Sequence, residues 1–251
     1  MTRLVLVTND DGYDAPGIHA LIEAVQPLGQ LVVVAPDREQ SAASHAITLD
    51  RPLRVYRADE GRYRINGTPS DCVHLGITHF TGGRLPDLVV SGINRGLNVG
   101  DDVTYSGTVA GAFEGTLLNV PSIAFSAEID NEGRSDFSRA GGLVRSIAQR
   151  VLGHGLQRGV LLNVNFPAGD YRGIRVTRQG TRSYRATAFE REDPSGRPYY
   201  WIAGMDMTPT GEPDGDHLAI REGFVSITPL QVNLTHEPSL EDLSRWDLEA
   251  G

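Results

Sequence analysis

The chain has 251 residues, 39% of them hydrophobic and 22% charged, which is enough apolar content for one large folded domain. Its net charge of −9 argues against a nucleic-acid polymer as ligand, because proteins that bind such polymers need a basic face. All 23 residues counted as Lys or Arg are arginine, which excludes a Walker-type phosphate loop and a Schiff-base lysine.

Cysteine content and hydropathy predict the cellular setting. The single cysteine, Cys72, excludes an intrachain disulfide and is typical of a reducing compartment. No apolar run reaches the length of a membrane span, and the apolar residues 4–7 are too few for a signal peptide. We therefore expect a cytoplasmic protein whose partners include neither a membrane nor a nucleic-acid polymer.

The first elements form a β-α-β unit. Residues 4–7 are a short apolar strand, residues 15–28 have the apolar stripe of a helix ending at Gly29, and residues 31–34 are a second buried strand. Such a unit predicts that the two strands are parallel neighbours. The polar turn after residue 7 and the polar loop after residue 36 should then lie side by side.

A hairpin and a second helix follow. Residues 53–57 and 62–65 alternate like the two strands of a hairpin. Thr68 has the character of a helix N-cap, with Pro69 after it and Asp71 beside the positive helix end, and this helix should run to about Phe80.

The next stretch changes from strand to loop to helix. Residues 88–91 are a buried strand, residues 92–106 a polar glycine-rich loop, and residues 107–118 a helix of small side chains. A glycine-rich loop before a helix N-terminus, at the carboxyl end of a strand, is suited to bind an anion. The stretch alone is also compatible with a long surface loop.

The remaining core elements complete a doubly wound pattern. Residues 122–126 predict a strand, residues 135–152 a helix with Ser135 as its N-cap, and residues 160–164 a strand. Strands and helices that alternate in this way predict an α/β fold with helices on both faces of a mostly parallel sheet, that is, a three-layer α/β/α core.

The last third of the chain differs in composition from this core. We expect the core to span about residues 1–170, a projecting β-hairpin about 174–203, and a C-terminal strand and helix arm about 224–251. The aromatic residues between Tyr184 and Trp201 suit a subunit contact, although they and Tyr105 could also stack a nucleobase.

Asp10 and Asp11 follow the first strand directly. Two carboxylates in one loop repel each other unless a cation lies between them, and oxygen ligands favour Mg²⁺, Mn²⁺ or Ca²⁺. The same residues could equally form a turn and a helix cap. Ser41, Ser44 and His45 lie in the loop after the second strand, where hydroxyls could bind the metal or a phosphate, or simply be solvated.

The glycine-rich loop adds two asparagines, Asn94 and Asn98, whose carbonyl oxygens are good ligands for hard cations and whose amides can donate to phosphate oxygens. Three loops with oxygen ligands and an anion-binding helix end would then meet. This combination predicts metal-assisted phosphoryl chemistry better than any one of its motifs does.

Five segments resemble the SurE family of metal-dependent survival-protein phosphatases, which act as 5′/3′-nucleotidases. These segments, in chain order, are LVTNDDGYDAPG, APDREQSAASHAIT, INGTPSDCV, SGINRGLNVGDDVTYSGTVAGA and GFVSITPLQVNL. The resemblance implies a Rossmann-like core and a homodimer or homotetramer that exchanges C-terminal elements. It also implies hydrolysis of nucleoside monophosphates, with other phosphate esters and short polyphosphate as further substrates.

By this resemblance each subunit holds one divalent cation, Mg²⁺ or Mn²⁺. The implied metal ligands are Asp10, Asp11, Ser41 and Asn94. The implied phosphate contacts are Asn98, Ser106, Gly107 and Thr108. Asn9, Ser44 and His45 from the neighbouring loops complete the predicted substrate contacts. Asp10 is the candidate catalytic residue, either orienting or deprotonating the attacking water.

Three alternatives remain at this point. A covalent aspartyl-phosphate route uses an Asp-x-Asp spacing, which the adjacent Asp10 and Asp11 do not have. A non-catalytic nucleotide or metal sensor could use the same loops, since fold does not determine function. A nucleotide-sugar transferase would need a second substrate domain for which the chain is too short.

Overall fold

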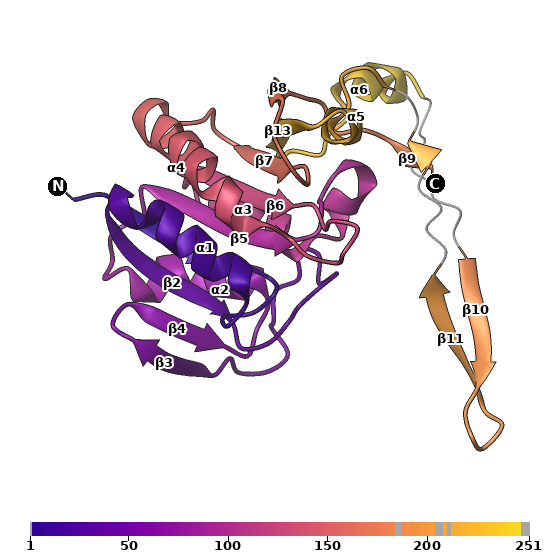
Figure 1. The fold of residues 1–251 in the computed structure, drawn as a ribbon, viewed down its shortest axis with the longest axis horizontal. Coiled ribbons are helices and arrows are strands. Elements are labelled where there is room, and N and C mark those ends of the chain that lie inside the picture. Colours follow the sequence, from indigo (N-terminus) through magenta and orange to yellow (C-terminus); the bar gives the residue numbers. More distant parts are fainter. Residues whose placement is uncertain (1, 184–186, 204–207, 210–211, 247–251) are drawn as a thin grey trace.

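A computed structural model describes residues 2–183, 187–203, 208–209 and 212–246. Its centre is a sheet of nine strands in the order β3-β4-β2-β1-β5-β6-β7-β13-β8, flanked by helices (Figure 1). The strands of this sheet are β1 (Leu4–Thr8), β2 (Gln30–Pro36), β3 (Val55–Asp59), β4 (Arg62–Ile65), β5 (Leu88–Arg95), β6 (Ser122–Ala127), β7 (Val160–Phe166), β8 (Gly173–Val176) and β13 (Phe224–Gln231).

Most neighbours in the sheet are parallel. Only β3 against β4 and β13 against β7 run antiparallel among the described pairs of this sheet. β1 pairs with β2 on one side and with β5 on the other, both in parallel. The chain therefore winds outward in opposite directions from β1, and the gap between the carboxyl ends of β1 and β5 is a topological switch point.

Helices cover both faces of the sheet. The core helices are α1 (Pro16–Val25), α2 (Pro69–Leu75), α3 (Gly107–Leu117) and α4 (Phe137–His154). Val5 and Val7 of β1 pack in one buried cluster with α1 and α4, whereas Leu4 and Leu6 pack with α2 in a second cluster. Successive side chains of a strand point to opposite faces, so one apolar run serves both layers. The predicted three-layer α/β/α core is confirmed.

Two helix starts test the capping predictions. Thr68 and Asp71 form a reciprocal capping box at α2, as the sequence indicated, and a π-helical turn continues α2 from Gly76 to Phe80. The N-cap of α4 is Asp136 and not Ser135, because the Asp136 carboxylate accepts the Ser138 amide at 3.1 Å.

The C-terminal third contains two corrections. Residues 174–176, predicted within the projecting hairpin, lie instead in β8 and pair with β13 in the main sheet. The hairpin is β10 (Thr187–Glu192) against β11 (Pro198–Ala203), and it extends away from the core (Figure 1). A short helix, α5 (Asp216–Arg221), leads into β13. β13 begins the predicted C-terminal arm, but it pairs with β7 and β8 and so belongs to the core sheet.

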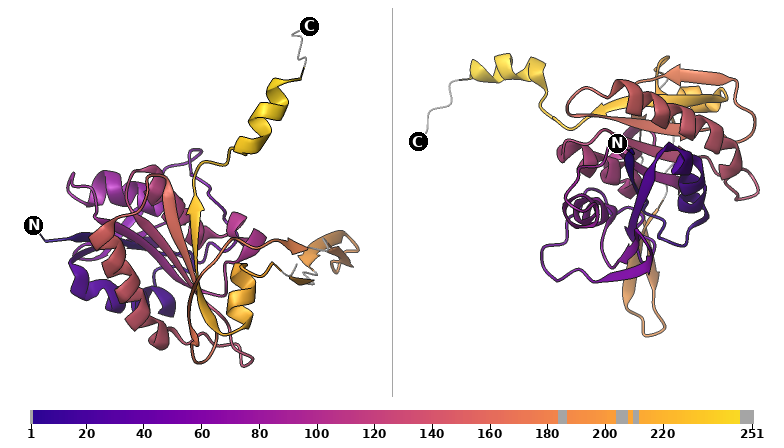
Figure 2. Two further views of the ribbon diagram at one scale, coloured as in Figure 1. Left: turned by 90° about the horizontal axis from the view of Figure 1, so that it is seen from above. Right: turned by 90° about the vertical axis from the view of Figure 1, so that its left-hand side faces the viewer.

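The terminal helix α6 (Glu237–Ser244) also projects from the body (Figure 2). It has no buried residue, and Leu234, Leu240, Leu243 and Trp246 in and beside it are all exposed. The end of the predicted C-terminal arm, residues 247–251, lies outside the described residues.

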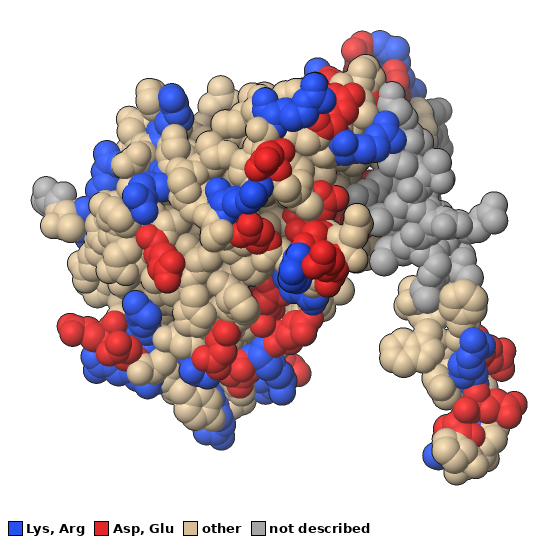
Figure 3. Space-filling view, in the orientation of Figure 1, with Lys and Arg blue, Asp and Glu red and all other residues tan. Residues whose placement is uncertain are grey.

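Acidic and basic side chains alternate over the face of the molecule seen in Figure 3, and no continuous basic surface is visible on that face. Among the helices of the described residues, none combines the length and hydropathy that crossing a membrane requires.

Candidate active site

The predicted loops converge at the carboxyl ends of β1, β2 and β5. The Gln40 amide donates to the Asp10 carbonyl at 2.8 Å, and this bond joins the loop after β2 to the loop after β1. The Arg95 amide, at the end of β5, donates to the Asp11 carboxylate at 3.1 Å. The three loops that carry the sequence-predicted residues are therefore bonded to one another at the switch point.

Asp10 lies directly against the first turn of α3. A side chain on Gly107 would place its Cβ 2.8 Å from the Asp10 Cβ and 3.0 Å from Asp10 Oδ2, so glycine is needed for this approach. The Thr108 hydroxyl donates a short hydrogen bond to Asp10 Oδ1. The carboxylate and the helix N-terminus, predicted from separate stretches of sequence, thus form one site.

Burial makes this site unfavourable for uncompensated negative charge. Asp10 is 5% exposed. Burial, together with the neighbouring Asp11 charge, raises the pKa of Asp10 to about 6 despite the Thr108 hydrogen bond. Burial also raises the pKa of Asp11. The Arg95 charge acts to lower the pKa of Asp11 but does not outweigh its burial.

These observations fit a hard divalent cation. The Asn9 side-chain oxygen is buried and has no hydrogen-bond partner among the described residues. The Asn94 amide nitrogen donates to the Gly96 carbonyl at 2.9 Å, which leaves its side-chain oxygen available. Within the described part of the chain no group of three His, Cys, Asp or Glu residues is arranged to hold a metal ion. The donor set at this site would therefore consist of two carboxylates plus neutral oxygens.

Asn94 belongs to β5 and not to the loop, because the strand extends to Arg95. Ser41 lies farther out: it is exposed, and its hydroxyl donates to Glu39 at 2.6 Å. Ser44 lies nearer α3, with its hydroxyl donating to the Thr104 carbonyl at 2.8 Å and its amide to the Tyr105 carbonyl at 3.0 Å. The structure brings Asp10 into contact with the α3 N-terminus, and Asn9 and Asp11 flank Asp10 in the same loop. Ser41 stands at the exposed rim.

Asn98 is held inside the molecule by polar groups from β6 and β7. Its amide N–H donates to Asn165 Oδ1 at 2.8 Å, its side chain donates to Ser126 at 2.8 Å, and its carbonyl accepts from Asn163 at 2.7 Å and from Asn165 at 3.0 Å. The position of Asn98 is therefore determined by buried side chains that point to one face of the sheet.

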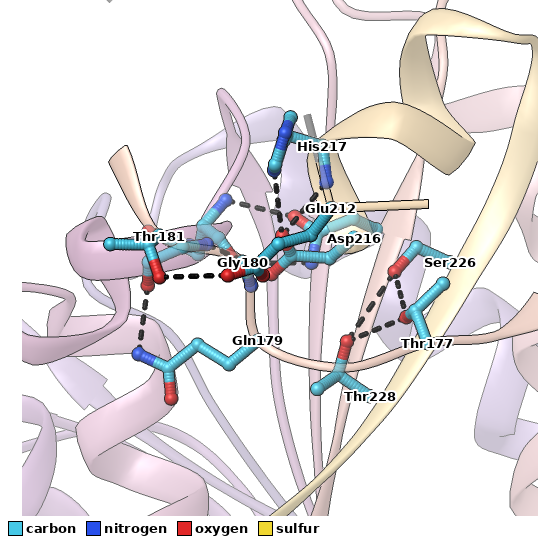
Figure 4. A network of polar contacts seen from close by, with 12 residues as sticks. Thr177, Gln179, Gly180, Thr181, Glu212, Asp216, His217, Ser226 and Thr228 are labelled. Carbon is cyan, nitrogen blue, oxygen red and sulfur yellow. Dashed lines mark hydrogen bonds and ion pairs between the residues drawn. The ribbon is translucent and has the colours of Figure 1, made fainter. Parts of the chain in front are cut away.

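A second clamp holds the same loop two residues later (Figure 4). The fully buried Asp216 accepts the Gly100 amide at 2.8 Å, and the Gln179 side chain donates to the Gly100 carbonyl at 3.0 Å. Asp216 also accepts the Gly180 amide at 3.1 Å. The glycine-rich loop is thus tied to the segments that lead into and out of the projecting hairpin.

A cavity of ≈ 610 Å³ opens beside this loop. Ser106, the N-cap of α3, lines it together with Ser44 and His45, and apolar side chains such as Phe113 and Leu230 form much of the rest. His45 Nε2 lies 2.8 Å from the Glu114 carboxylate. The cavity therefore has a polar end at α3 and an apolar body.

Sequence reasoning did not single out Glu114, Asp216 or the Asn163–Asn165 pair. For two of these, the sequence contains a feature that could have indicated them. Glu114 is the only charged residue in α3, and Asn163 and Asn165 alternate along a strand that is otherwise apolar. Asp216 lies in a segment rich in Pro, Gly and Asp, and its partner Gly100 is 116 residues away in sequence.

Comparison with known proteins finds one matching family and several similar proteins. Residues 5–186 match the profile of the family described as "Survival protein SurE". The chain is 50% identical to a protein named "5′-nucleotidase SurE" from Syntrophotalea carbinolica, with 98% of each chain covered. It is 49% identical to a protein of the same name from Myxococcus xanthus, with 98% of this chain and 94% of the relative covered.

A solved structure of the same family also resembles this chain in fold. The crystal structure of the SurE protein from Aquifex aeolicus superposes with a TM-score of 0.86 at 44% identity, covering 96% of this chain and 98% of the other. On the sequence match, the full-length relatives and the shared architecture, this chain belongs to the SurE family.

Proposed function

We propose that this protein is a divalent-metal-dependent phosphomonoesterase that hydrolyses nucleoside 5′-monophosphates, and 3′-monophosphates, to nucleoside and phosphate. The observation that carries the proposal is the packing of the α3 N-terminus on the buried Asp10. An anion-binding helix end and a cation-binding carboxylate at one point suit a phosphate ester bridged to a metal. Relatives 50% and 49% identical over nearly the whole chain carry the name 5′-nucleotidase.

The cation would be held by Asp10, Asp11, Ser41 and Asn94, and the oxygen-only donor set favours Mg²⁺ or Mn²⁺, with one ion per subunit. When bound, such a cation neutralises charge on the phosphate and acidifies water. Ser41 would have to turn from Glu39 toward Asp10 to take part.

The proposed phosphate contacts are the donors at the α3 N-terminus that are not already hydrogen-bonded within the protein. The Val109 and Ala110 amides are bonded to Ser106, and the Thr108 backbone amide interacts with the Asp10 carboxylate. The Gly107 amide, for which no acceptor is found among the described residues, is therefore suited to bind a phosphate oxygen together with the Ser106 hydroxyl. The Thr108 hydroxyl is engaged by Asp10, so its role is to orient that carboxylate.

Three further groups would complete the substrate site. The side-chain amides of Asn98 and Asn9 each use one hydrogen within the protein, on Ser126 and on the Gly12 carbonyl, and each has a second hydrogen to donate. The Ser44 hydroxyl would have to turn from the Thr104 carbonyl to take part. Asp10 would orient or deprotonate the attacking water, because its carboxylate lies against the helix end that binds the phosphate.

We expect purified protein to release inorganic phosphate from AMP or GMP in the presence of Mn²⁺ or Mg²⁺, and EDTA to abolish the release. Re-addition of the metal in excess over EDTA should restore it, which controls for irreversible unfolding. A screen over 5′- and 3′-nucleotides, p-nitrophenyl phosphate and short polyphosphate would define the substrate range. Binding of nucleotide without phosphate release under every metal condition would instead identify a sensor.

We also propose that the projecting hairpin and α6 form contacts in a homodimer or homotetramer. Of the arm predicted at about residues 224–251, the part exchanged between subunits would begin after β13, because β13 pairs with β7 and β8 of its own chain. On the hairpin, Tyr200, Trp201 and Ile202 are exposed, as are Leu240 and Leu243 on α6. Exposed apolar groups on elements that project from the body of the described chain suit burial by a partner. Tyr184, predicted in the same contact, lies outside the described residues. The cytoplasmic location stays a prediction from cysteine content.

Light scattering at micromolar concentration should therefore give at least twice the chain mass of 27.2 kDa. The double variant Leu240→Asp and Leu243→Asp should lower the mass, because it places charges in the proposed contact. Glu241→Gln, on the same helix and also exposed, should leave the mass unchanged. A monomeric wild-type protein would contradict the proposal.

A further inference from the structure

Glu114 joins two histidines beside the candidate active site. Its carboxylate lies 2.8 Å from His45 Nε2 through one oxygen and 2.9 Å from His74 Nδ1 through the other. The Glu114 side chain is 7% exposed, whereas those of His45 and His74 are 32% and 49% exposed. The histidines come from the loop after β2 and from α2, so three separate elements meet at one buried acid.

The charge state of Glu114 follows from these contacts. Burial acts to raise the pKa of Glu114, but the hydrogen bonds and charges of His45 and His74 outweigh it and lower the pKa. The carboxylate is therefore ionised and can only accept, so the ring nitrogens that face it carry hydrogens. Asp71, the other acid nearby on α2, uses its carboxylate on Thr48 and Thr68, which leaves Glu114 as the acid that holds His45.

Helix α3 connects this cluster to the phosphate end of the site. Ser106 caps the helix at its N-terminus, and Glu114 lies two turns farther along the same rigid element. His45 lines the cavity of ≈ 610 Å³ into which Ser106 also points, and the Phe113 ring packs against the imidazole with centroids 5.1 Å apart. Asp10 and Asp11 do not line this cavity. His45 thus lies on the Ser106 side of the proposed phosphate site, and Asp10 and Asp11 lie on a different side.

We propose that His45 is the proton donor to the leaving nucleoside oxygen, and that Glu114 is a positioning residue that holds the His45 ring with support from His74. The His45 Nε2–H is committed to Glu114, so the transferable proton is on Nδ1. As water forms the new P–O bond and the bond to the nucleoside oxygen breaks, the Nδ1 proton passes to that oxygen. The attacking water gives its proton to Asp10, and His45 is reprotonated from solvent.

This inference rests on the proposed phosphomonoesterase function, and a leaving-group comparison tests it separately. The two substrates are AMP and its analogue with sulfur in place of the bridging 5′ oxygen, since a thiolate leaves without needing a proton. We expect His45→Gln and Glu114→Gln to lose about 100-fold in kcat on AMP and less than about 3-fold on the sulfur analogue. His74→Gln should show the same selectivity with a smaller loss. p-Nitrophenyl phosphate, whose leaving anion is also stable, gives a second measurement.

The matched controls are Glu23→Gln on the exposed side of α1 and His154→Gln at the end of α4, which should retain activity on both substrates. Thermal unfolding checks that both Glu114→Gln and His45→Gln are folded. Equal losses on both substrates, or no loss on AMP, would overturn the inference. Wild-type protein that releases phosphate from neither substrate would instead contradict the proposed function.

Discussion

Replacing Asp10 by Asn should reduce phosphate release by between about 100-fold and 10,000-fold while making the metal-free protein more stable at neutral pH. The loss follows because the neutral amide can neither attract the cation nor deprotonate water. The gain follows because Asp10 is ionised at neutral pH in a buried site where burial raises its pKa from 3.8 to about 6.

The sign of the stability effect can be worked out from this shift. The folded-state pKa lies above the unfolded one, so the stability that the protonated carboxyl contributes is present below pH 3.8 and is lost as pH rises through about 6. The difference of about two units corresponds to about 3 kcal/mol as an upper value. Asp10→Asn in EDTA should therefore be more stable than wild type by about 1–3 kcal/mol at pH 8, and the difference should shrink toward pH 4.

Urea unfolding at several pH values, with and without Mn²⁺, measures this effect. Added metal should raise the stability of the wild type, because it binds the folded state only, and should do so far less for Asp10→Asn. The control is Asp14→Asn, an exposed carboxylate paired with Arg64, which should keep activity and change stability by less than about 1 kcal/mol. An Asp10→Asn enzyme with near-normal turnover in Mn²⁺ would refute the assignment.

Gly107→Ala should reduce kcat by about 100-fold without removing any catalytic group. The new methyl would lie 2.8 Å from the Asp10 Cβ and 3.0 Å from its Oδ2, a distance at which the first turn of α3 or the Asp10 side chain must move. Either movement increases the distance between the Asp10 carboxylate and the amides at the N-terminus of α3. Overpacking of this kind should also lower the free energy of unfolding by about 1–3 kcal/mol.

The matched control is Gly142→Ala in α4, where a methyl meets no atom within 4 Å. There the better helix propensity of alanine should stabilise the protein by about 1 kcal/mol and leave phosphate release unchanged. Steady-state kinetics and urea unfolding of the two variants side by side measure both effects. If Gly107→Ala were as active as Gly142→Ala, the close packing of α3 on Asp10 would have no catalytic consequence.

Several parts of the site could be predicted from local sequence, and others could not. The Asn-Asp-Asp-Gly turn and the capped helix at Ser106 are short motifs, so their local chemistry can be read directly. Asn94 was placed in the loop although it ends β5, because propensity does not show how far pairing with β6 extends a strand. The Asp216 clamp on Gly100 joins residues far apart in the chain, and no local pattern indicates such a contact.

By itself, the sequence determined the alternation of strands and helices, the absence of lysine from any phosphate site, and the oxygen-rich loops at the strand ends. These follow from periodicity and side-chain chemistry, which act over a few residues. Only the tertiary structure decided that α3 packs on Asp10, that Glu114 is bonded to His45 and His74, and that Ser41 stands at the rim. Such contacts depend on how helices dock on the sheet, and docking is determined by close packing across the whole core.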